Sequence, residues 1–277
     1  MTAQPPDPTS LDLLNLRGRV RVYDLAQPLE AATPTSPTHP PFRMALYARH
    51  GDFVRDNGFS GANELITMSG HAGTHIDAFC HVSHNGLLHG GIDAREASIG
   101  GRFRSHGVET IDPIFCRGLL LDAAAAAGRS TLEPGHRVSA AELETACQRQ
   151  NVEVKEGDAV LVRTGWPVDR FHDAAAFLGF DGGVPGPDDS AARWLAEKKV
   201  SVTGADTLAY EWLAPGAGLS RLPVHLILLF EHGIHIIETM NLEELARDRV
   251  YEFLFVATPL KLVGATGSPV RPLAVVT

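Results

Sequence analysis

Three imidazoles and one carboxylate lie within eleven residues of this chain, in the order His71, His75, Asp77 and His81. Neutral imidazole and ionised carboxylate are ligands for divalent metals of the zinc or manganese type. Residues i and i+2 share a face of an extended strand, so His75 and Asp77 can point at one ion. His71 can reach the same ion from the preceding turn, which Gly73 makes conformationally permissive. The spacing predicts a metal site with His71, His75 and Asp77 as ligands and His81 beside it.

The same cluster has two other interpretations. Histidines are often ordinary core or surface residues, and a tight cluster can belong to a histidine-rich loop. A helical H-x-x-x-H metalloprotease motif needs a glutamate after its first histidine as general base. That position is Ala72 here, and Gly73 is a poor residue for a helix interior. The pattern therefore excludes the helical protease site and favours a metal site next to a strand.

The composition is that of an ordinary globular protein, with 44% hydrophobic and 21% charged residues. A length of 277 residues suits one large domain or two small ones. The formal net charge of −9 argues against a general nucleic-acid or anionic-membrane surface. The most apolar short run, 226–230, is far below the roughly 20 residues that a membrane-spanning helix needs. We therefore expect neither nucleic-acid nor membrane partners.

Cysteine usage and the first residues bear on the cellular compartment. Cys80, Cys116 and Cys147 show no C-x-x-C pairing, and a sparse, odd set fits reduced thiols better than a disulfide framework. Residues 1–10 are polar and proline-rich and lack the features of a signal peptide. We expect a cytoplasmic protein in which Cys80 is a small apolar residue rather than a nucleophile.

Strands and helices must hold these side chains in place. The run 64–68 predicts a strand that leads directly into the metal motif, as a rigidly held ligand set requires. Ser139 and Glu142 form a capping box for a helix that ends near Gln150. The near-continuous apolar run 159–163 predicts a strand covered on both faces. Further expected elements are strands at 20–25, 118–122, 200–203 and 251–263 and a helix at 189–198. This alternation, with its long loops, indicates a mixed sheet.

The motif H-x-G-T-H-x-D-x-x-x-H resembles the signature of the metal-dependent cyclase-like hydrolases, the family of bacterial kynurenine formamidase and isatin hydrolase. The resemblance runs from about Tyr23 to the C-terminus. Individually weaker matches follow in the family's order, at 24–29, 157–166, 204–207, 224–238, 259–262 and 267–271. The resemblance implies a single α/β domain of the swivelling β/β/α type with a mixed, barrel-like central sheet. We expect this domain at residues 19–277, after an N-terminal tail of residues 1–18.

The resemblance also implies a second metal position. In the family, the counterpart of Asp77 can bridge two ions, and the second ion is held by residues that match His225 and Glu238. Glu231 and His235 are the competitors if the register of this segment shifts. The resemblance thus implies one or two zinc or manganese ions per chain, and a homodimer or homotetramer.

Asp206 has two interpretations. It matches the family's G-x-D-x segment and could orient a metal ligand or His81 from behind. It could equally be a turn-capping residue before Thr207. Arg163 and Trp166, at the end of the predicted strand 159–163, are expected to be structural.

The predicted chemistry is hydrolysis of a C–N amide bond in a small carbonyl compound. A divalent ion can lower the pKa of a bound water to about 7 and polarise a carbonyl oxygen. His81 could take a proton from the nucleophile and deliver it to the leaving amine. The resemblance implies an arylformamide or a cyclic amide such as isatin as substrate. The alternatives are a lactone or ester hydrolase with the same site, and a non-catalytic metal-binding or ligand-binding member of the fold.

One departure from the family pattern concerns the substrate pocket. Many family members carry a tryptophan in a P-x-W-P-like segment, whereas the corresponding stretch 34–40 has none. Candidates for apolar pocket surface are therefore phenylalanines, namely Phe42, Phe53, Phe59 and Phe79. This departure leaves the substrate within the class open.

Overall fold

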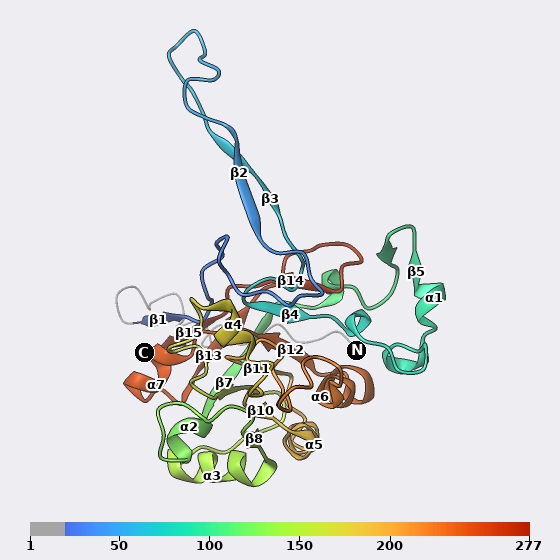
Figure 1. Ribbon diagram of the computed structural model, residues 1–277, viewed down its shortest axis with the longest axis vertical. Helices are drawn as coiled ribbons and strands as arrows, with labels where there is room; N and C mark the ends of the chain where they lie inside the picture. Colours follow the sequence, from blue (N-terminus) through green and yellow to red (C-terminus); the bar gives the residue numbers. More distant parts are fainter. Residues whose placement is uncertain (1–19) are drawn as a thin grey trace, which may run out of the picture.

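The computed structural model describes residues 20–277 of the chain. In this part, a mixed sheet of nine strands forms the centre of the fold (Figure 1). These strands are β1 (Arg21–Asp24), β4 (His75–Asp77), β7 (Ile114–Asp122), β9 (Ala159–Arg163), β11 (Val202–Ala205), β12 (His235–Glu238), β13 (Glu252–Ala257), β14 (Gly267–Pro269) and β15 (Leu273–Val276). Their order across the sheet is β1-β15-β13-β7-β9-β11-β12-β4-β14. The four middle strands β7, β9, β11 and β12 are parallel, and the strands on either side pair antiparallel.

Both faces of the sheet are covered, which explains the continuous apolar strand at its middle. All five residues of β9 are buried. Because neighbours on a strand point to opposite faces, Val160 and Val162 join the core beneath α3 (Ala140–Gln150) and α5 (Asp189–Glu197). Leu161 joins the core on the other face, together with Ile237 and Phe255. The mixed, curled sheet confirms the predicted α/β fold class.

Short helices and small ladders surround this sheet. The remaining helical segments are α1 (Ala94–Ala97), α2 (Ala123–Ala126), α4 (Ala174–Leu178), α6 (Pro223–His225), α7 (Glu243–Asp248), the π-helical η5 (Leu226–His232) and the 3-10 turns η2 (Phe79–His81), η3 (His89–Gly91) and η4 (Val108–Thr110). The two-stranded ladders pair β2 (Arg43–Ala48) with β3 (Asn63–Thr67), β5 (Ser98–Ile99) with β6 (Arg102–Phe103), and β8 (Arg137–Val138) with β10 (Gly186–Pro187). In the described part of the chain, none of these helices has both the length and the hydropathy to cross a bilayer.

The predictions that rest on neighbouring residues agree with the structure better than those that depend on which strands pair. The capping box of Ser139 and Glu142 is present at the start of α3, as predicted. The strand predicted at 64–68 exists as β3, but it pairs with β2 in a hairpin outside the central sheet, and β4 carries the metal motif instead. Of the final strands predicted within 251–263, the structure has one, β13, which ends at Ala257. The predicted tail 1–18 and the start of the predicted domain at residue 19 lie outside the described residues.

Candidate metal centre

The motif residues lie on β4 and in the turn before it. The sheet register pairs His75 with Glu238 of β12 on one side and with Pro269 of β14 on the other. The ring of His71 lies against Gly267, where an added Cβ would come within 2.5 Å of the His71 Cε1 atom. The antiparallel pairing therefore brings Glu238 beside His75, and a glycine at 267 leaves room for His71.

Asp77 lies at the centre of the cluster and is fully buried. Its Oδ1 atom is 2.8 Å from Nδ1 of His71 and 3.6 Å from Nε2 of His75. Its Oδ2 atom is 3.7 Å from Nε2 of His225. The two oxygens of one carboxylate thus face two different groups of side chains.

The second of these groups comes from the ends of α6 and β12, which carry His225 and Glu238. Glu238 places Oε1 3.1 Å from Nε2 of His225 and Oε2 3.3 Å from Nε2 of His75. Potential ligand atoms of Asp77, His225 and Glu238 lie within 4.8 Å of one another, and all three residues are buried. The helical turns of η5 separate His225 from Glu238 in the sequence and return the chain to the sheet.

The two competing residues of this segment point elsewhere. Glu231 is exposed and forms an ion pair of 3.2 Å with Arg193. His235 donates from Nδ1 to the backbone oxygen of Asp77 at 2.8 Å and stacks on Phe79. The geometry therefore favours His225 and Glu238 over the shifted register.

Buried atoms without a hydrogen-bond partner test whether a metal fits. Nδ1 of His71 and both carboxylate oxygens of Asp77 are buried and make no hydrogen bond of acceptable geometry, although Nδ1 and Oδ1 are only 2.8 Å apart. Orphaned buried polar atoms are costly unless a further group satisfies them. Here they converge with imidazole nitrogens, a donor set that suits zinc or manganese. The residues present fit a divalent ion.

His71 and His75 each present one ring nitrogen to the cluster and anchor the other. Nε2 of His71 lies 2.9 Å from the Thr266 hydroxyl, which leaves Nδ1 to face Asp77. Nδ1 of His75 donates to the backbone oxygen of Gly73 at 2.8 Å, which leaves Nε2 to face the carboxylates. Anchoring of this kind fixes ring orientation and tautomer in metal-binding histidines.

His225 is anchored by Glu211, a residue whose role in the site was not predicted. The Glu211 carboxylate is buried and lies 2.7 Å from Nδ1 of His225. It also accepts the backbone N–H groups of Val224 and His225, both at 3.0 Å. The pair has the geometry of the carboxylate–histidine arrangement found behind many metal sites. Glu211 lies five residues after Asp206, and that short spacing is the signal in the sequence that could have pointed to it.

Both central carboxyl groups favour the ionised state. Burial opposes ionisation of Asp77, but the neighbouring imidazoles of His81 and His71 hold its pKa below the ordinary value. Burial opposes ionisation of Glu238 as well, and hydrogen bonds from His225 and His75 lower its pKa. Ionised carboxylates are the form that binds a metal.

The two histidines next to Glu238 favour the protonated state in the absence of metal. Burial lowers the pKa of His75, but the hydrogen bond and charge of Glu238 outweigh it, so the pKa is raised. Burial opposes the charge on His225 too, yet Glu211 and Glu238 raise its pKa well above the usual value. A metal that binds here must displace these protons.

His81 lies among the same side chains. Its ring centroid is 4.0 Å from that of His71 and 6.2 Å from that of His225. Burial lowers the pKa of His81 to about 4, although the charge of Asp77 acts in the opposite direction. The ring is therefore neutral at pH 7 and able to accept a proton. Its nitrogen also lies close enough to His71 and Asp77 to join their ligand group.

His39 was not among the predicted site residues. Its ring stacks on His71 with centroids 5.1 Å apart and lies 6.4 Å from His81. Burial lowers the pKa of His39, and the neighbouring His71 adds to the effect. The signal that could have found it is the match of 34–40 to the family's tryptophan segment, which lines the pocket.

A cavity of about 50 Å³ opens onto the cluster. Its polar wall consists of site residues, and its apolar wall is aliphatic, formed by Leu208, Ala209, Leu219 and Leu222. A larger hollow of about 620 Å³ includes Thr74 but none of the predicted ligand residues. The chemistry therefore belongs to the smaller cavity, where the titratable groups converge.

None of the four candidate phenylalanines lines this cavity. Phe42 is buried, and Phe79 stacks on His235 at 3.9 Å. Phe53 and Phe59 are exposed in the hairpin loop between β2 and β3. In this structure the apolar wall of the small cavity is therefore aliphatic, and the part of these phenylalanines in substrate binding stays a prediction.

Cys80 is not a nucleophile in this geometry. Its Sγ atom donates to the backbone oxygen of Ala265 at 3.6 Å. Burial raises the pKa of the thiol to about 12, so the reactive thiolate is scarce at neutral pH.

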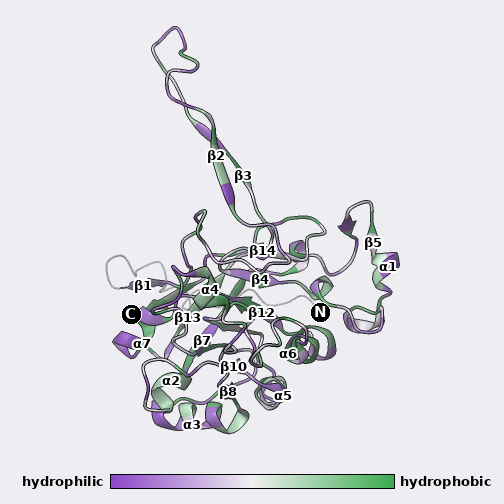
Figure 2. Ribbon diagram, in the orientation of Figure 1, coloured by the Kyte–Doolittle hydropathy of each residue, from purple (hydrophilic) through white to green (hydrophobic). Residues whose placement is uncertain are grey.

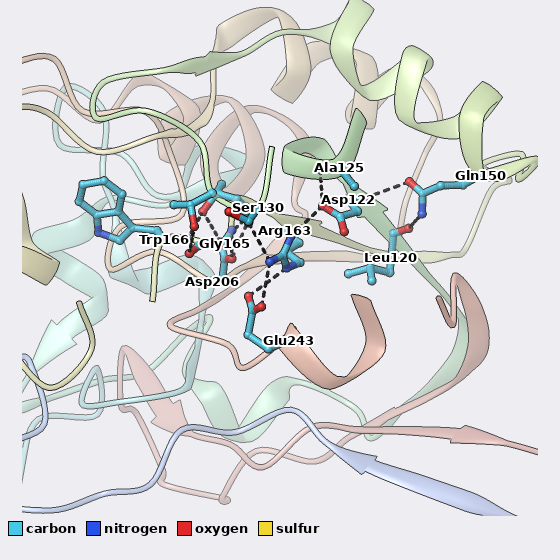
Figure 3. A network of polar contacts seen from close by, with 12 residues as sticks. Leu120, Asp122, Ala125, Ser130, Gln150, Arg163, Gly165, Trp166, Asp206 and Glu243 are labelled. Atoms are coloured by element: carbon cyan, nitrogen blue, oxygen red, sulfur yellow. Dashed lines mark hydrogen bonds and ion pairs between the residues drawn. The ribbon is translucent and has the colours of Figure 1, made fainter. Parts of the chain in front are cut away.

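Asp206 holds the turn that follows β9 and makes no hydrogen bond to a predicted ligand (Figure 3). Its carboxylate accepts the backbone N–H and hydroxyl of Thr164 and the backbone N–H of Gly165, at 2.6–3.0 Å. Burial raises the pKa of Asp206 to about 6, although the bonds from Thr164 and the charge of Arg163 act against this. None of its hydrogen bonds reaches His81 or a predicted ligand, so the contacts favour a structural role.

Arg163 joins three elements at the same end of the sheet (Figure 3). Its guanidinium donates to Asp122 at 2.9 Å and forms a bidentate ion pair with the Glu243 carboxylate at 2.9 and 2.8 Å. Asp122 in turn caps α2 through the backbone N–H of Ala125. Arg163 thus holds β9, the start of α2 and α7 together, which agrees with the structural role expected for it.

Comparisons with known proteins agree with this geometry. A family model described as "Putative cyclase" matches residues 23–212. Isatin hydrolase of Roseibium aggregatum is 26% identical over 269 residues, which cover 94% of each chain. Kynurenine formamidase of Bacillus cereus is 28% identical over 252 residues, which cover 90% of this chain and 94% of that protein. A crystal structure described as a novel cyclase superposes with a TM-score of 0.83 at 28% identity, covering 97% of this chain and 93% of the other.

Proposed function

The chain belongs to the putative cyclase family, and on that premise we propose that it is a metal-dependent hydrolase of a C–N amide bond in a small carbonyl compound. The observation that carries this proposal is the convergence of His71, Asp77 and their neighbours, with three buried ligand atoms left unsatisfied. Isatin hydrolase and kynurenine formamidase, both similar over nine-tenths or more of this chain, act on a cyclic amide and on an arylformamide. The proposed substrate is of one of these two kinds.

The proposed ligands are His71, His75 and Asp77 for one ion, with Asp77, His225 and Glu238 for a second. The donor set of imidazole nitrogens and carboxylate oxygens supports zinc or manganese. When bound, such an ion polarises a carbonyl oxygen and makes a water molecule nucleophilic at neutral pH.

His81 is the proposed proton carrier. Its position beside His71 and Asp77 supports this role, because a ring that is neutral at pH 7 can accept a proton from the attacking water. The proton then moves from His81 to the nitrogen of the leaving amine. The aliphatic wall at Leu208 and Leu222 would exclude water from the other side of the substrate.

Location, assembly and domain limits are part of the proposal. We place the protein in the cytoplasm, supported by three cysteines that are all free. We assign the hydrolase domain to residues 19–277, after a tail of residues 1–18. The chain is proposed to act as a homodimer or homotetramer.

The proposed ligands are tested by removing them. His75→Ala and Asp77→Ala should each strip bound metal and abolish hydrolysis of formanilides and isatin, whereas the exposed His172→Ala should change neither. Metal content is measured by elemental analysis of protein purified without chelator. Full metal content and activity in both variants would overturn the assignment.

The number of ions is tested by titration. At saturating metal the stoichiometry should approach two per chain, and His225→Ala should reduce it to one while His75 and Asp77 still hold the first ion. A single ion in the unaltered protein would reduce the proposal to a one-metal site.

A further inference from the structure

Two polar residues at the metal centre have no part in the proposed chemistry. The cavity of about 50 Å³ is lined by four of the proposed ligands, His81, four aliphatic side chains, and the pair Ser36 and His39. In Figure 2 the strand β4, which carries His75 and Asp77, is mainly hydrophilic. Ser36 and His39 extend this polar side of the cavity beyond the ligands. Among the lining residues, they are the groups left to recognise a substrate by hydrogen bonds.

The apolar wall of the cavity gives a substrate little directional guidance. Among the described residues that line the cavity, imidazoles are the only aromatic side chains. No phenylalanine, tyrosine or tryptophan of this wall fixes the plane of a substrate by stacking. In small-molecule sites a few precisely placed polar groups fix the orientation of the ligand. Within this chain, the orientation of a substrate therefore depends on the metal site and on Ser36 and His39.

The ring of His39 faces the cavity with its hydrogen-bonding capacity unused. It stacks on His71, with 5.1 Å between the ring centroids and 25° between the planes, and lies 6.4 Å from His81. Within residues 20–277 its ring nitrogens have no hydrogen-bond partner, in contrast to the anchored rings of His71 and His75. A neutral imidazole carries one N–H donor and one acceptor nitrogen. His39 can therefore donate a hydrogen bond to a group that binds beside His71.

The turn that carries His39 is held by its own hydrogen bonds. The backbone oxygen of Ser36 accepts the N–H of His39 at 3.0 Å, and the hydroxyl groups of Ser36 and Thr38 lie 2.8 Å apart. The backbone N–H of Ser69 donates to the backbone oxygen of Pro40 at 3.0 Å, which ties the turn to the start of the metal motif. A side chain supported in this way is preorganised for recognition.

The position of His39 limits where its partner on the substrate can lie. The scissile carbonyl group has to reach the ion, and the His39 ring lies against the face of the proposed ligand His71. The partner must therefore be attached close to the scissile carbon. A simple arylformamide carries only hydrogen on that carbon, whereas a cyclic amide such as isatin carries a second carbonyl group on the adjoining carbon. Of the two proposed kinds of substrate, the cyclic amide has an acceptor oxygen at the required place.

We infer that His39 is a substrate-binding residue that selects amides with a second carbonyl group beside the scissile one, by donating a hydrogen bond to the second oxygen. Ser36 positions His39, because its backbone oxygen and hydroxyl hold the turn. The inference rests on the proposed hydrolysis and adds to it the choice between the two kinds of substrate.

The test compares isatin with formanilide as substrates of the metal-loaded full chain. His39→Phe keeps an aromatic ring over His71 but removes both ring nitrogens. It should lower kcat/KM for isatin about 10-fold, mainly through KM, and that for formanilide less than about 2-fold, because one neutral hydrogen bond is lost with isatin alone. His39→Asn and His39→Gln place an amide N–H where Nδ1 or Nε2 lies, and one of them should recover most of the activity on isatin. The matched control His172→Phe, at an exposed residue, should change neither substrate's kcat/KM.

Metal content separates recognition of the substrate from a structural role of His39. His39→Phe should bind as much metal as the unaltered protein, because the proposed ligands are all present. An equal loss of kcat/KM for both substrates, an unchanged value for isatin, a loss of metal, or activity of the unaltered protein on formanilide alone would each overturn the inference and leave the proposed hydrolysis intact. Hydrolysis of neither substrate by the unaltered, metal-loaded protein would overturn the proposed function itself, and the inference with it.

Discussion

His81 is the residue that separates hydrolysis from metal storage, because only catalysis needs a proton carrier beside the ligands. His81→Ala should keep most of the metal and the fold but lose about 10²–10⁴ in kcat, the usual range for a general acid–base group. The loss should be smaller for substrates with a better leaving amine, since protonation then matters less in the transition state. Steady-state kinetics on a series of substituted formanilides measures this.

The outcomes that contradict this role are distinct. Loss of metal in His81→Ala would make His81 a ligand, which its position in the group with His71 and Asp77 allows. An unchanged kcat across the substrate series would remove His81 from the mechanism.

Proton release on metal binding follows from the raised pKa values of His75 and His225. Below its pKa each ring carries a proton that a metal must displace, so the apparent affinity falls as pH falls and rises as pH rises. Calorimetric titration in two buffers of different ionisation enthalpy should show net proton release at pH 7. Metal affinity that does not change between about pH 6 and pH 8 would contradict the cited shifts.

At the scale of elements, the Arg163 network sets how firmly β9 is held to α2 and α7. Removing one partner of a buried ion pair leaves the other charge uncompensated. Arg163→Met should therefore lower the free energy of unfolding by about 3–5 kcal/mol in urea titrations. No predicted ligand contacts Arg163, so the folded variant should still bind metal.

The control for this prediction is an exposed ion pair. Lys199 and Glu156 lie 3.1 Å apart with both side chains exposed. Lys199→Met should cost about 1 kcal/mol or less, the range for surface pairs. A loss in Arg163→Met no larger than in this control would show that the network does not hold the elements together.

At the scale of the whole molecule, metal removal should lower the thermal stability of the protein without unfolding it. The two main core clusters lie on either side of the sheet and include none of the proposed ligands. A ligand at 100 times its dissociation constant stabilises the folded state by about 2.7 kcal/mol. For a chain of this size that corresponds to a Tm shift of about 5–10 °C between the metal-bound and chelated protein.

Thermal scans followed by circular dichroism, with and without chelator, measure this shift. Asp77→Ala is the matched control and should show no shift on chelation, because it lacks the ion. Unfolding of the unaltered protein by chelator at room temperature would mean that the metal, rather than the core, holds the fold.

Short-range patterns by themselves determined much of this protein. The spacing of His71, His75 and Asp77 was enough to predict a metal cluster, because a turn and a strand alone bring those side chains together. The capping box at Ser139 and the apolar run 159–163 predicted α3 and β9, since caps and strand periodicity depend on neighbours in the sequence. The fold class followed from the ordered family matches.

Only the tertiary structure decided which distant residues join the cluster. The pairing of β4 with β12 places Glu238, rather than Glu231, beside His75. Long-range packing brings in Glu211 and His39 and leaves β3 paired with β2 alone, outside the central sheet. The physical reason is that register and strand partners depend on contacts summed over the whole chain, which no local pattern contains.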